Sequence, residues 1–346
     1  MPGVTRGDSP RWFLWPLALL YEAAVRLRER LYSMGLLRSR RLDGVVISVG
    51  NLTVGGTGKT PMVLWLAQHL QAEGKRCGIL TRGYRGEISP QGPTSDEVRL
   101  LQARLGPEGA LGVGADRYAC GRELAARGIG WFVLDDGFQH WRLARDVDIV
   151  LVDATDPLGG GRLLPAGRLR EPCSALRRAD IIVITRSRSA PAVEAVLRRY
   201  SDAPIFYAHT HLDALVPCKK ESASGRSPSP GEGKWFAFCG IGNPPAFFAD
   251  LRAWGFAVVG SKVFADHHRY TPRDVDAILR QAHSALPSEA AAIVCTEKDL
   301  FNFDSTDWGD ADLYYCRISL ELDREEDFTR TIAALLESRR SMRKSN

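Results

Sequence analysis

The stretch GNLTVGGTGKT, at positions 50–60, constrains the fold of this chain more than any other part of its sequence. It follows a short apolar run, Val45 to Val49, and precedes a helical pattern from Val63 to Leu70. A strand, a glycine-rich loop and a helix in this order form a phosphate-binding P-loop. Clustered glycines let backbone N–H groups converge on phosphate oxygens, and the positive end of the following helix adds to the attraction. The motif therefore predicts nucleotide binding on a parallel α/β sheet.

Two side chains of this loop have expected roles of their own. Lys59 is expected to reach the β- and γ-phosphates of ATP, and the Thr60 hydroxyl to complete the coordination shell of Mg²⁺. The pattern departs from the general one at Thr53, where a P-loop usually carries glycine. A glycine-rich turn without nucleotide is the alternative. The predicted nucleotide-binding residues are Thr53, Val54, Gly55, Gly56, Thr57, Gly58, Lys59 and Thr60.

After Asp43, short apolar runs alternate with glycine-rich turns and helical stretches. This pattern predicts a P-loop NTPase-like, mostly parallel sheet with flanking helices, followed by a smaller α/β C-terminal lobe. The expected strands are Gly44–Val49, Cys77–Thr81, Trp131–Leu134, Ile149–Val152, Ile181–Thr185, Trp235–Cys239, Ala257–Val259 and Ile293–Thr296.

Composition divides the chain into four expected segments. Residues 1–41 are expected to form an N-terminal amphipathic, membrane-associating helix, and residues 42–218 the P-loop domain. Residues 219–234, KKESASGRSPSPGEGK, contain no large aliphatic or aromatic side chain and so predict a linker or exposed loop. Residues 235–340 are expected to form the C-terminal α/β lobe.

The basic character of the chain is confined to its N-terminal arm. Residues 1–41 hold eight arginines against three acidic residues, which accounts for the whole net charge of +5. A nucleic-acid-binding domain is expected to carry its basic face on the folded core, so this distribution argues against nucleic acid and favours an anionic membrane surface. The apolar run from Trp12 to Tyr21 is too short to span a bilayer, so we expect an interfacial helix. An ordinary helix packed on the domain is the alternative.

The seven cysteines are scattered singly, without a C-x-x-C pair. Neither a zinc site nor a disulfide framework is predicted, and a reducing compartment is expected.

A second motif, WFVLDDGFQH, is an apolar strand that ends in two carboxylates, Asp135 and Asp136. Beside a P-loop strand, one of this pair is expected to serve Mg²⁺, which takes oxygen ligands directly or through water. The sequence leaves open which of the two contacts the metal. The alternative is a helix N-cap, for which Asp is also favoured.

Guanine specificity is tested by the [NT]-K-x-D pattern, in which the Asp binds the base. The nearest match, Thr296-Glu-Lys-Asp299, fails by one position because its Lys adjoins the Asp. ATP is therefore favoured over GTP.

Several arginine-rich clusters follow strands at the edge where doubly wound folds bind ligands. Arginine suits a sugar phosphate because the guanidinium group forms bidentate bonds, although a surface salt bridge is an equal alternative for each single residue. The run Asp266-His-His268 suggests a metal site, but adjacent side chains of an extended segment point apart.

Seven motifs occurring in order resemble the tetraacyldisaccharide 4′-kinase family, which phosphorylates a lipid A precursor. They are GNLTVGGTGKTP, TRGYRG, VGADR, LDDGFQH, LLPAGRLRE, ADHHRYT and TEKD. The resemblance implies ATP and Mg²⁺ as cofactors, and as acceptor an acylated glucosamine disaccharide that already carries one phosphate. It also implies a site between two lobes, at the cytoplasmic face of the bacterial inner membrane, with peripheral or monotopic attachment. No protein partner is implied.

The resemblance also implies roles for individual residues. Asp96 corresponds to the base that accepts the proton of the sugar hydroxyl, supported by His267, while Glu97 and the Asp135-Asp136 pair serve Mg²⁺ and the nucleotide. The implied catalytic residues are Asp96, His267, Lys59 and Asp136; the implied metal ligands are Thr60, Glu97 and Asp135. The implied substrate residues are Arg82, Tyr84, Arg117, Gln139, His140 and Arg170.

A free Asp has a pKa near ~4, so we expect a neighbour that raises this pKa or shares the proton. The long interlobe linker and the tail after Asp323 depart from the family pattern.

Two other functions are compatible with a P-loop. A nucleotide-hydrolysing switch or assembly factor with a protein partner would carry the same P-loop and Asp motif, but it has no need of arginine-rich loops around an acceptor site. In a nucleotide-binding structural protein, Asp96 and the two carboxylates of the LDDGFQH motif would have no function.

Overall fold

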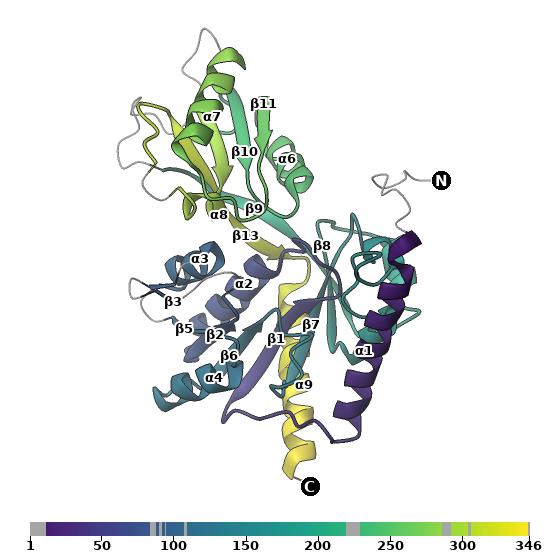
Figure 1. The fold of residues 1–346 in the computed structure, drawn as a ribbon. Helices are drawn as coiled ribbons and strands as arrows, with labels where there is room; N and C mark the ends of the chain where they lie inside the picture. Colours follow the sequence, from purple (N-terminus) through teal and green to yellow (C-terminus); the bar gives the residue numbers. More distant parts are fainter. Residues whose placement is uncertain are drawn as a thin grey trace.

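The computed structural model describes residues 12–83, 88–89, 92–93, 95–106, 109–218, 229–285, 292–303 and 306–344. In this part of the chain an 11-stranded sheet runs through two lobes, in the order β11-β10-β12-β13-β9-β8-β7-β1-β6-β2-β5. The P-loop lobe lies at the bottom of Figure 1 and the smaller lobe at the top. Neighbouring strands of this sheet are parallel except β9 and β13. The predicted mostly parallel α/β class is confirmed.

The P-loop lobe is built on strands that are largely buried on both faces, as expected of apolar parallel strands, except for the partly exposed edge strand Ala110–Val113. These strands are β1 (Val45–Asn51), β2 (Cys77–Thr81), β5 (Ala110–Val113), β6 (Trp131–Asp135), β7 (Val147–Asp153) and β8 (Ile181–Thr185). One face is covered by α2 (Lys59–Ala72), α3 (Asp96–Leu105) and α9 (Glu325–Lys344), and the other by α4 (Arg117–Ala126), α5 (Pro191–Leu197) and the 3-10 helix η3 (Cys173–Arg178). The short pieces β3 (Ile88–Ser89), β4 (Gly92–Pro93) and η2 (Gly159–Gly161) lie in loops.

The smaller lobe repeats the α/β pattern with its own cores. It contains β10 (Lys234–Cys239), β11 (Ala257–Val263), β12 (Ala292–Thr296), α6 (Pro244–Ala253), α7 (Pro272–Ala285) and α8 (Glu297–Leu300). All eight strands expected from the sequence are present, with bounds that differ by up to four residues.

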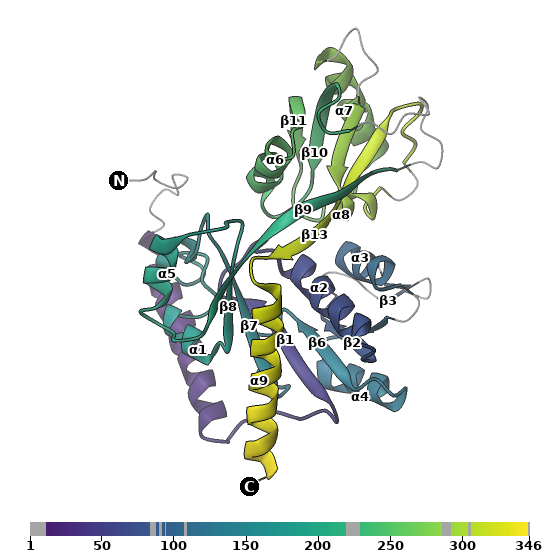
Figure 2. The ribbon, with the colours of Figure 1, turned by 180° about the vertical axis from the view of Figure 1, so that it is seen from behind.

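Two long strands join the lobes: β9 (Ile205–Pro217) and β13 (Leu313–Leu322). They pair with each other in antiparallel fashion, and β9 also pairs with β8 of the P-loop lobe while β13 pairs with β12. Figure 2 shows this ribbon rising from one lobe to the other. The sequence did not indicate these strands because β9 is fully buried only in its first four residues and half-exposed beyond. The segment 219–234 was expected to be a linker or an exposed loop, and its residues 219–228 lie outside the described part.

The C-terminal helix α9 packs on the P-loop lobe, although it was expected to belong largely to a C-terminal lobe ending at residue 340. Phe328, Ile332 and Leu336 join the core formed by α2 and the central strands. Near its end, Arg339 Nη2 lies 2.5 Å from Asp180 Oδ1, and Arg343 pairs with Asp146. We therefore propose that α9 is part of the P-loop domain and that these two ion pairs hold its basic C-terminal end against the sheet.

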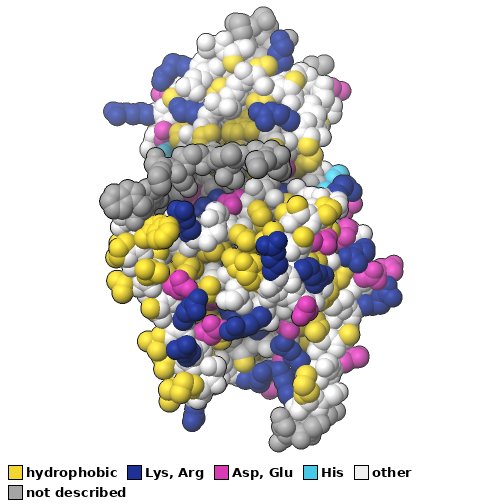
Figure 3. Space-filling view, turned by 90° about the vertical axis from the view of Figure 1, so that its right-hand side faces the viewer, with side chains coloured by type: hydrophobic (Ala, Val, Ile, Leu, Met, Phe, Trp, Pro, Cys, Tyr) yellow, Lys and Arg dark blue, Asp and Glu magenta, His cyan; other side chains and the backbone are white. Residues whose placement is uncertain are grey.

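The N-terminal segment forms η1 (Trp12–Leu14) and α1 (Trp15–Ser33), and α1 contains no buried residue. Phe13, Trp15, Leu19 and Leu20 are more than half exposed. Figure 3 looks onto this side of the molecule, where hydrophobic side chains and Lys or Arg side chains are interspersed. Among the described residues, no helix has the length and apolar character needed to cross a bilayer.

Candidate active site

The P-loop leaves β1 and returns into α2 through two glycines with left-handed backbone, Gly55 at φ 126° and Gly58 at φ 84°. Only glycine adopts these conformations without strain, which is the local reason for the glycine cluster. Asn51, the last residue of β1, fixes the loop from inside. Its Nδ2 donates to the Thr53 carbonyl at 2.7 Å and to Thr57 Oγ1 at 3.0 Å. Asn51 was not among the predicted site residues, and its polar side chain at the end of an apolar strand was the available signal.

Lys59 begins α2 and points back toward the loop. Its Nζ donates to Asn51 Oδ1 at 3.2 Å and lies 3.5 Å from Asp136 Oδ1. The ammonium group therefore stands between the end of β1 and the carboxylates at the end of β6, where the terminal phosphates of a nucleotide bound by this loop would lie.

The LLPAGRLRE segment runs along the P-loop. The Val54 N–H donates to the Arg168 carbonyl at 2.8 Å, and the Arg170 N–H to the Leu52 carbonyl at 2.7 Å. The Arg168 guanidinium also donates to the Val54 carbonyl. This pairing fixes Arg170, whose Nη1 contacts both oxygens of Asp136 at 2.8 and 2.7 Å. Arg168, the other arginine of this segment that contacts the P-loop, was not among the predicted site residues, although it stands in the LLPAGRLRE motif.

The two carboxylates at the end of β6, Asp135 and Asp136, have different surroundings. Burial, followed by the nearby charges of Asp136 and Glu97, raises the pKa of Asp135 to about 6, and Thr81 Oγ1 donates to its Oδ2 at 2.9 Å. Burial also acts to raise the pKa of Asp136, but Lys59 and Arg170 outweigh it and hold this pKa below its usual value. The negative charges of Asp136 and Glu97 thus act on Asp135, and a bound cation would relieve this repulsion.

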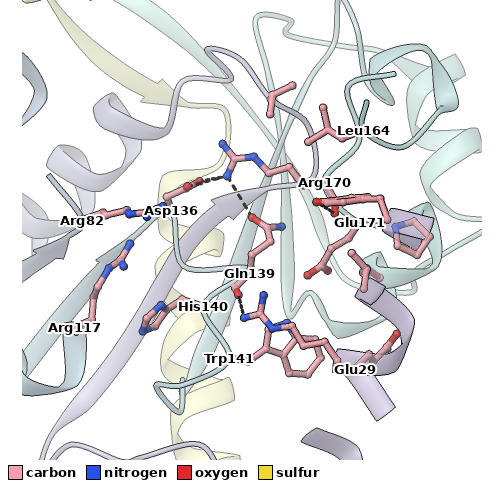
Figure 4. A pocket seen from close by; sticks show the side chains of 16 residues that line it. Glu29, Arg82, Arg117, Asp136, Gln139, His140, Trp141, Leu164, Arg170 and Glu171 are labelled. Atoms are coloured by element: carbon pink, nitrogen blue, oxygen red, sulfur yellow. Dashed lines mark hydrogen bonds and ion pairs between the residues drawn. The ribbon is translucent and has the colours of Figure 1, made fainter. Parts of the chain in front are cut away.

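A cavity of about 370 Å³ opens from the P-loop toward α1, as Figure 4 shows. Its lining residues are Tyr21, Val25, Arg28, Glu29, Val54, Arg82, Arg117, Asp136, Gln139, His140, Trp141, Leu164, Arg170, Glu171, Pro172 and Ala175. The structure therefore brings together five of the six predicted substrate residues. The sixth, Tyr84, lies outside the described residues.

Helix α1 forms one wall of this cavity. The Tyr21 hydroxyl donates to the Arg170 carbonyl at 2.8 Å, and Arg28 Nη2 donates to the Gln139 carbonyl at 2.9 Å. Gln139 Nε2 in turn donates to the Asn51 carbonyl at 3.0 Å, so α1 is connected to the P-loop through one side chain. From the sequence, α1 was expected in the membrane surface, with packing on the domain as the alternative, and was not expected to line the acceptor site.

Two basic groups at the cavity are shielded from water. Arg117 is 7% exposed, and burial lowers the pKa of its guanidinium despite the opposing charges of Asp135 and Asp136. Burial and the neighbouring arginines, Arg117 first among them, lower the pKa of His140 to about 4. His140 is therefore neutral at physiological pH.

Asp96 and His267 meet across the two lobes. His267 Nδ1 lies 2.9 and 3.0 Å from the two oxygens of Asp96, and Asn302 Nδ2 donates to Asp96 Oδ2 at 3.0 Å. Lys298 Nζ lies 3.2 Å from Glu97 Oε1 and 4.0 Å from Asp96 Oδ2. Asn302 and Lys298, both from the smaller lobe, were not predicted as site residues.

The sequence led us to expect a neighbour that raises the pKa of Asp96 or shares its proton, and the first of these alternatives is not what the structure shows. Burial acts to raise this pKa, but the hydrogen bond from His267 and the charge of Lys298 outweigh it, and the pKa is lowered. The hydrogen bond to Asp96 raises the pKa of His267 above its ordinary value. The His267 side chain is 18% exposed against 2% for Asp96, so the imidazole is the outer member of the pair. The neighbouring His268 contacts Asp274 instead, at 3.1 Å.

The TEKD motif has a structural task in the smaller lobe. Thr296 and Asp299 form a capping box at the start of α8, and Asp299 accepts from the Gly240 N–H and the Tyr270 hydroxyl. The segment that lies beside the P-loop is the one after β8, where Thr185 Oγ1 donates to the Thr57 carbonyl and Arg186 Nη2 to the Gly56 carbonyl, each at 3.1 Å. This segment, residues 185–188, reads TRSR and carries no acid for a guanine base.

A parallel sheet with a P-loop, a carboxylate pair on the adjacent strand and a basic acceptor cavity defines a nucleotide-dependent phosphotransferase of the P-loop class. A sequence model of the family described as tetraacyldisaccharide-1-P 4′-kinase matches residues 10–337. The chain belongs to this family.

Curated relatives support the assignment over most of their length. A tetraacyldisaccharide 4′-kinase of Halothermothrix orenii is 36% identical over 322 residues, covering 84% of this chain and 82% of the relative. One of Geobacter sulfurreducens is 41% identical over 284 residues, covering 78% of each. Among solved structures, LpxK from Aquifex aeolicus in complex with ATP has a TM-score of 0.70 and 31% identity, covering 94% of this chain and 99% of that one.

Proposed function

We propose that this enzyme transfers the γ-phosphate of ATP to the 4′-hydroxyl of a tetraacylated glucosamine disaccharide 1-phosphate. Family membership supports the reaction. The structural observation that carries it is the cavity of Figure 4, because one wall holds Val54 of the P-loop and Asp136, and the others hold arginines that suit a phosphorylated sugar.

ATP and Mg²⁺ are the cofactors of this proposal. The residues fit them: the loop from Thr53 to Thr60 offers its amides, and the charges of Asp136 and Glu97 act on the buried carboxylate of Asp135. We propose Thr60, Glu97 and Asp135 as metal ligands, since Asp136 is already held by Arg170 and Lys59. When bound, Mg²⁺ neutralises charge on the β- and γ-phosphates.

The Asp96–His267 pair is proposed as the base. Both Asp96 oxygens already accept hydrogen bonds, from His267, from Asn302 and from the Glu97 N–H at 2.8 Å. The pair as a unit, rather than Asp96 alone, therefore takes the proton of the sugar hydroxyl, with His267 as its exposed end. Because His267 belongs to the smaller lobe, the base is complete only when the lobes are correctly placed.

The acceptor is a glycolipid, and we propose that α1 lies in the membrane surface at the cytoplasmic face of the inner membrane. The exposed apolar side chains Phe13, Trp15, Leu19 and Leu20 support this, with flanking arginines at the level of the headgroups. Removing residues 1–41 should move the enzyme from the vesicle-bound to the free fraction at low salt. A truncated enzyme that still sediments with vesicles would place the anchor elsewhere.

The test of the reaction uses radiolabelled ATP with the disaccharide 1-phosphate in mixed micelles. We expect label in the glycolipid, and Lys59→Ala should abolish it. Label that appears only in free phosphate would favour the nucleotide-hydrolysing switch instead.

A further inference from the structure

We propose that Arg168 and Arg186 are positioning residues for the nucleotide: each holds one carbonyl group of the P-loop, so that the N–H groups of the loop face the phosphates before ATP binds. This inference rests on the proposed function for the identity of the nucleotide. Neither arginine belongs to the P-loop motif, and neither lines the acceptor cavity. Arg168 comes from the LLPAGRLRE segment, and Arg186 from the loop after β8.

The hydrogen bonds of the P-loop differ between its carbonyl groups and its N–H groups. Four carbonyls of the loop accept hydrogen bonds from side chains outside it: those of Thr53, Val54, Gly56 and Thr57 accept from Asn51, Arg168, Arg186 and Thr185, respectively. The N–H groups from Gly55 to Gly58, in contrast, have no acceptor within the described part of the chain. Successive N–H groups that are left open in this way form a concave anion-binding site.

The planar peptide bond explains how a held carbonyl directs an N–H group. In a trans peptide unit the C=O and N–H bonds point to opposite sides, and rotation about the C–N bond is strongly hindered. The contact of Arg186 with the Gly56 carbonyl therefore fixes the direction of the Thr57 N–H. The contact of Arg168 fixes the Gly55 N–H in the same way. Without such contacts, the glycines of the loop would let its peptide planes turn, and binding would have to order them.

Both arginines are held in turn by carboxylates from one short segment, the end of β7 and the loop that follows. Arg168 Nη1 lies 2.8 Å from Asp156 Oδ2, and Arg186 Nε lies 3.0 Å from Asp153 Oδ2. Asp153 is buried and accepts hydrogen bonds from the N–H and the hydroxyl of Thr155. A guanidinium group carries five N–H donors in a rigid plane, so it can bond a carboxylate and a carbonyl at once. The ammonium group of lysine, on its flexible stem, does not reproduce this bridge.

The backbone of Arg186 and the space above Gly55 support the same role. Arg186 has a φ of 65°, in the left-handed region that residues with a Cβ rarely adopt. Such strain persists where the surroundings fix it, and it gathers at ligand sites. Arg168 lies so close to the loop that a Cβ on Gly55 would be 2.4 Å from its Nη2. The glycine at this position therefore admits the guanidinium as well as the left-handed turn.

The test measures the binding of ATP and of ADP, each with Mg²⁺ and without acceptor, by calorimetry on the full-length enzyme. Arg168→Ala and Arg186→Ala should each weaken the binding of both nucleotides about tenfold, as expected for loss of hydrogen bonds from a charged group. ADP is affected because it keeps the β-phosphate that a P-loop binds. At saturating ATP, kcat for transfer to the glycolipid should stay near the wild-type value. Arg168 is exposed, so its variants should fold and carry the test even if Arg186→Ala does not.

Two variants separate the geometry of the arginine from its charge. Arg168→Lys keeps the charge and should not restore the affinity. Asp156→Asn leaves every positive charge in place and should nevertheless weaken nucleotide binding, because Arg168 loses the partner that holds it. Arg162→Ala is the matched control and should bind both nucleotides as the wild type does, since this exposed arginine of the same segment faces the Trp15 ring of α1.

Other outcomes would overturn the assignment. If Arg168→Lys binds nucleotide as the wild type does, or if Asp156→Asn binds it more tightly, the guanidinium acts through its charge alone. If the alanine variants weaken the binding of ATP but not of ADP, the arginines contact the γ-phosphate themselves. If they lower kcat with unchanged affinity, they act in the transfer step. A wild-type enzyme that binds both nucleotides but labels no glycolipid would remove the proposed function alone, whereas one that binds neither nucleotide would remove both proposals.

Discussion

The contact between Asp96 and His267 gives the sharpest prediction about catalysis, because it joins two lobes through one hydrogen-bonded pair. A positioned general base contributes about 10²–10⁴-fold to a rate. This factor corresponds to about 3–5 kcal/mol of transition-state stabilisation. His267 Nδ1 lies within 3.0 Å of both Asp96 oxygens, so removing either partner removes the function of the pair. Asp96→Asn and His267→Asn should each lower kcat by a factor in this range.

The decisive measurement is a double-mutant cycle. If the two residues act as one unit, the variant that carries both substitutions should be no slower than the slower single variant. Turnover is measured by transfer of labelled phosphate at saturating acceptor, and ATP affinity is measured separately by calorimetry. This affinity should change little, because His267 lies in the other lobe and the hydrogen-bond partners of Asp96, which are His267, Asn302 and the Glu97 N–H, are not P-loop residues. His268→Asn is the matched control, since this neighbour contacts Asp274 and not Asp96.

The joint action of Asp96 and His267 is refuted if the losses of the two single variants multiply in the double variant. It is refuted equally if either single variant turns over at a near-normal rate. A loss shared by His268→Asn would show that the loop, rather than the imidazole, matters.

Three further predictions concern the site and the fold. Arg170→Ala should lower kcat/KM about tenfold, because it removes the charged hydrogen bonds from Nη1 to both oxygens of Asp136, and Arg122→Ala, on the exposed surface of α4, serves as the control. Phe328→Ala, on a residue that is 0% exposed, should cost about 3–5 kcal/mol in urea unfolding, whereas Glu337→Ala on the exposed face of α9 should stay within about 0.5 kcal/mol. Because the pKa of His267 is raised in the folded state, the contribution of His267 to stability should be complete below about pH 6.5 and lost as the pH rises through the folded-state pKa. The free energies of unfolding of His267→Asn and the wild type, measured at pH 6 and pH 9, should therefore differ most at pH 6.

The parts of the fold that follow from local pattern could be predicted from the sequence. Buried parallel strands are continuous apolar runs, so β2 and β8 were predicted with their observed bounds. β9 and β13 were missed because each passes from a buried sheet to a half-exposed ribbon, and neither shows one clear period. The place of α9 depends on contacts with residues more than 100 positions away, such as Phe206 and Asp180, which no local pattern contains.

Among the site residues too, some could be predicted from local sequence and others depend on the tertiary fold. The P-loop motif fixes its own backbone, so its residues could be chosen from the sequence, whereas Asn302 reaches Asp96 only because two lobes meet. The TEKD motif is a different case: it fails the guanine pattern on spacing alone, and only the structure shows that Thr296 and Asp299 cap α8. Arg28 was interpreted as a headgroup contact, yet its guanidinium donates to Gln139 of the acceptor cavity.

Helix α1 carries exposed apolar side chains on its outer surface and, through Tyr21 and Arg28, a wall of the acceptor cavity on its inner one. With α1 resting in lipid, the mouth of the cavity lies level with the glycolipid's sugar, so the acceptor can be phosphorylated without leaving its leaflet. Turnover should then follow the mole fraction of acceptor in the surface rather than its bulk concentration. Diluting the acceptor with inert lipid should slow the enzyme even when the total amount of acceptor in the tube is constant.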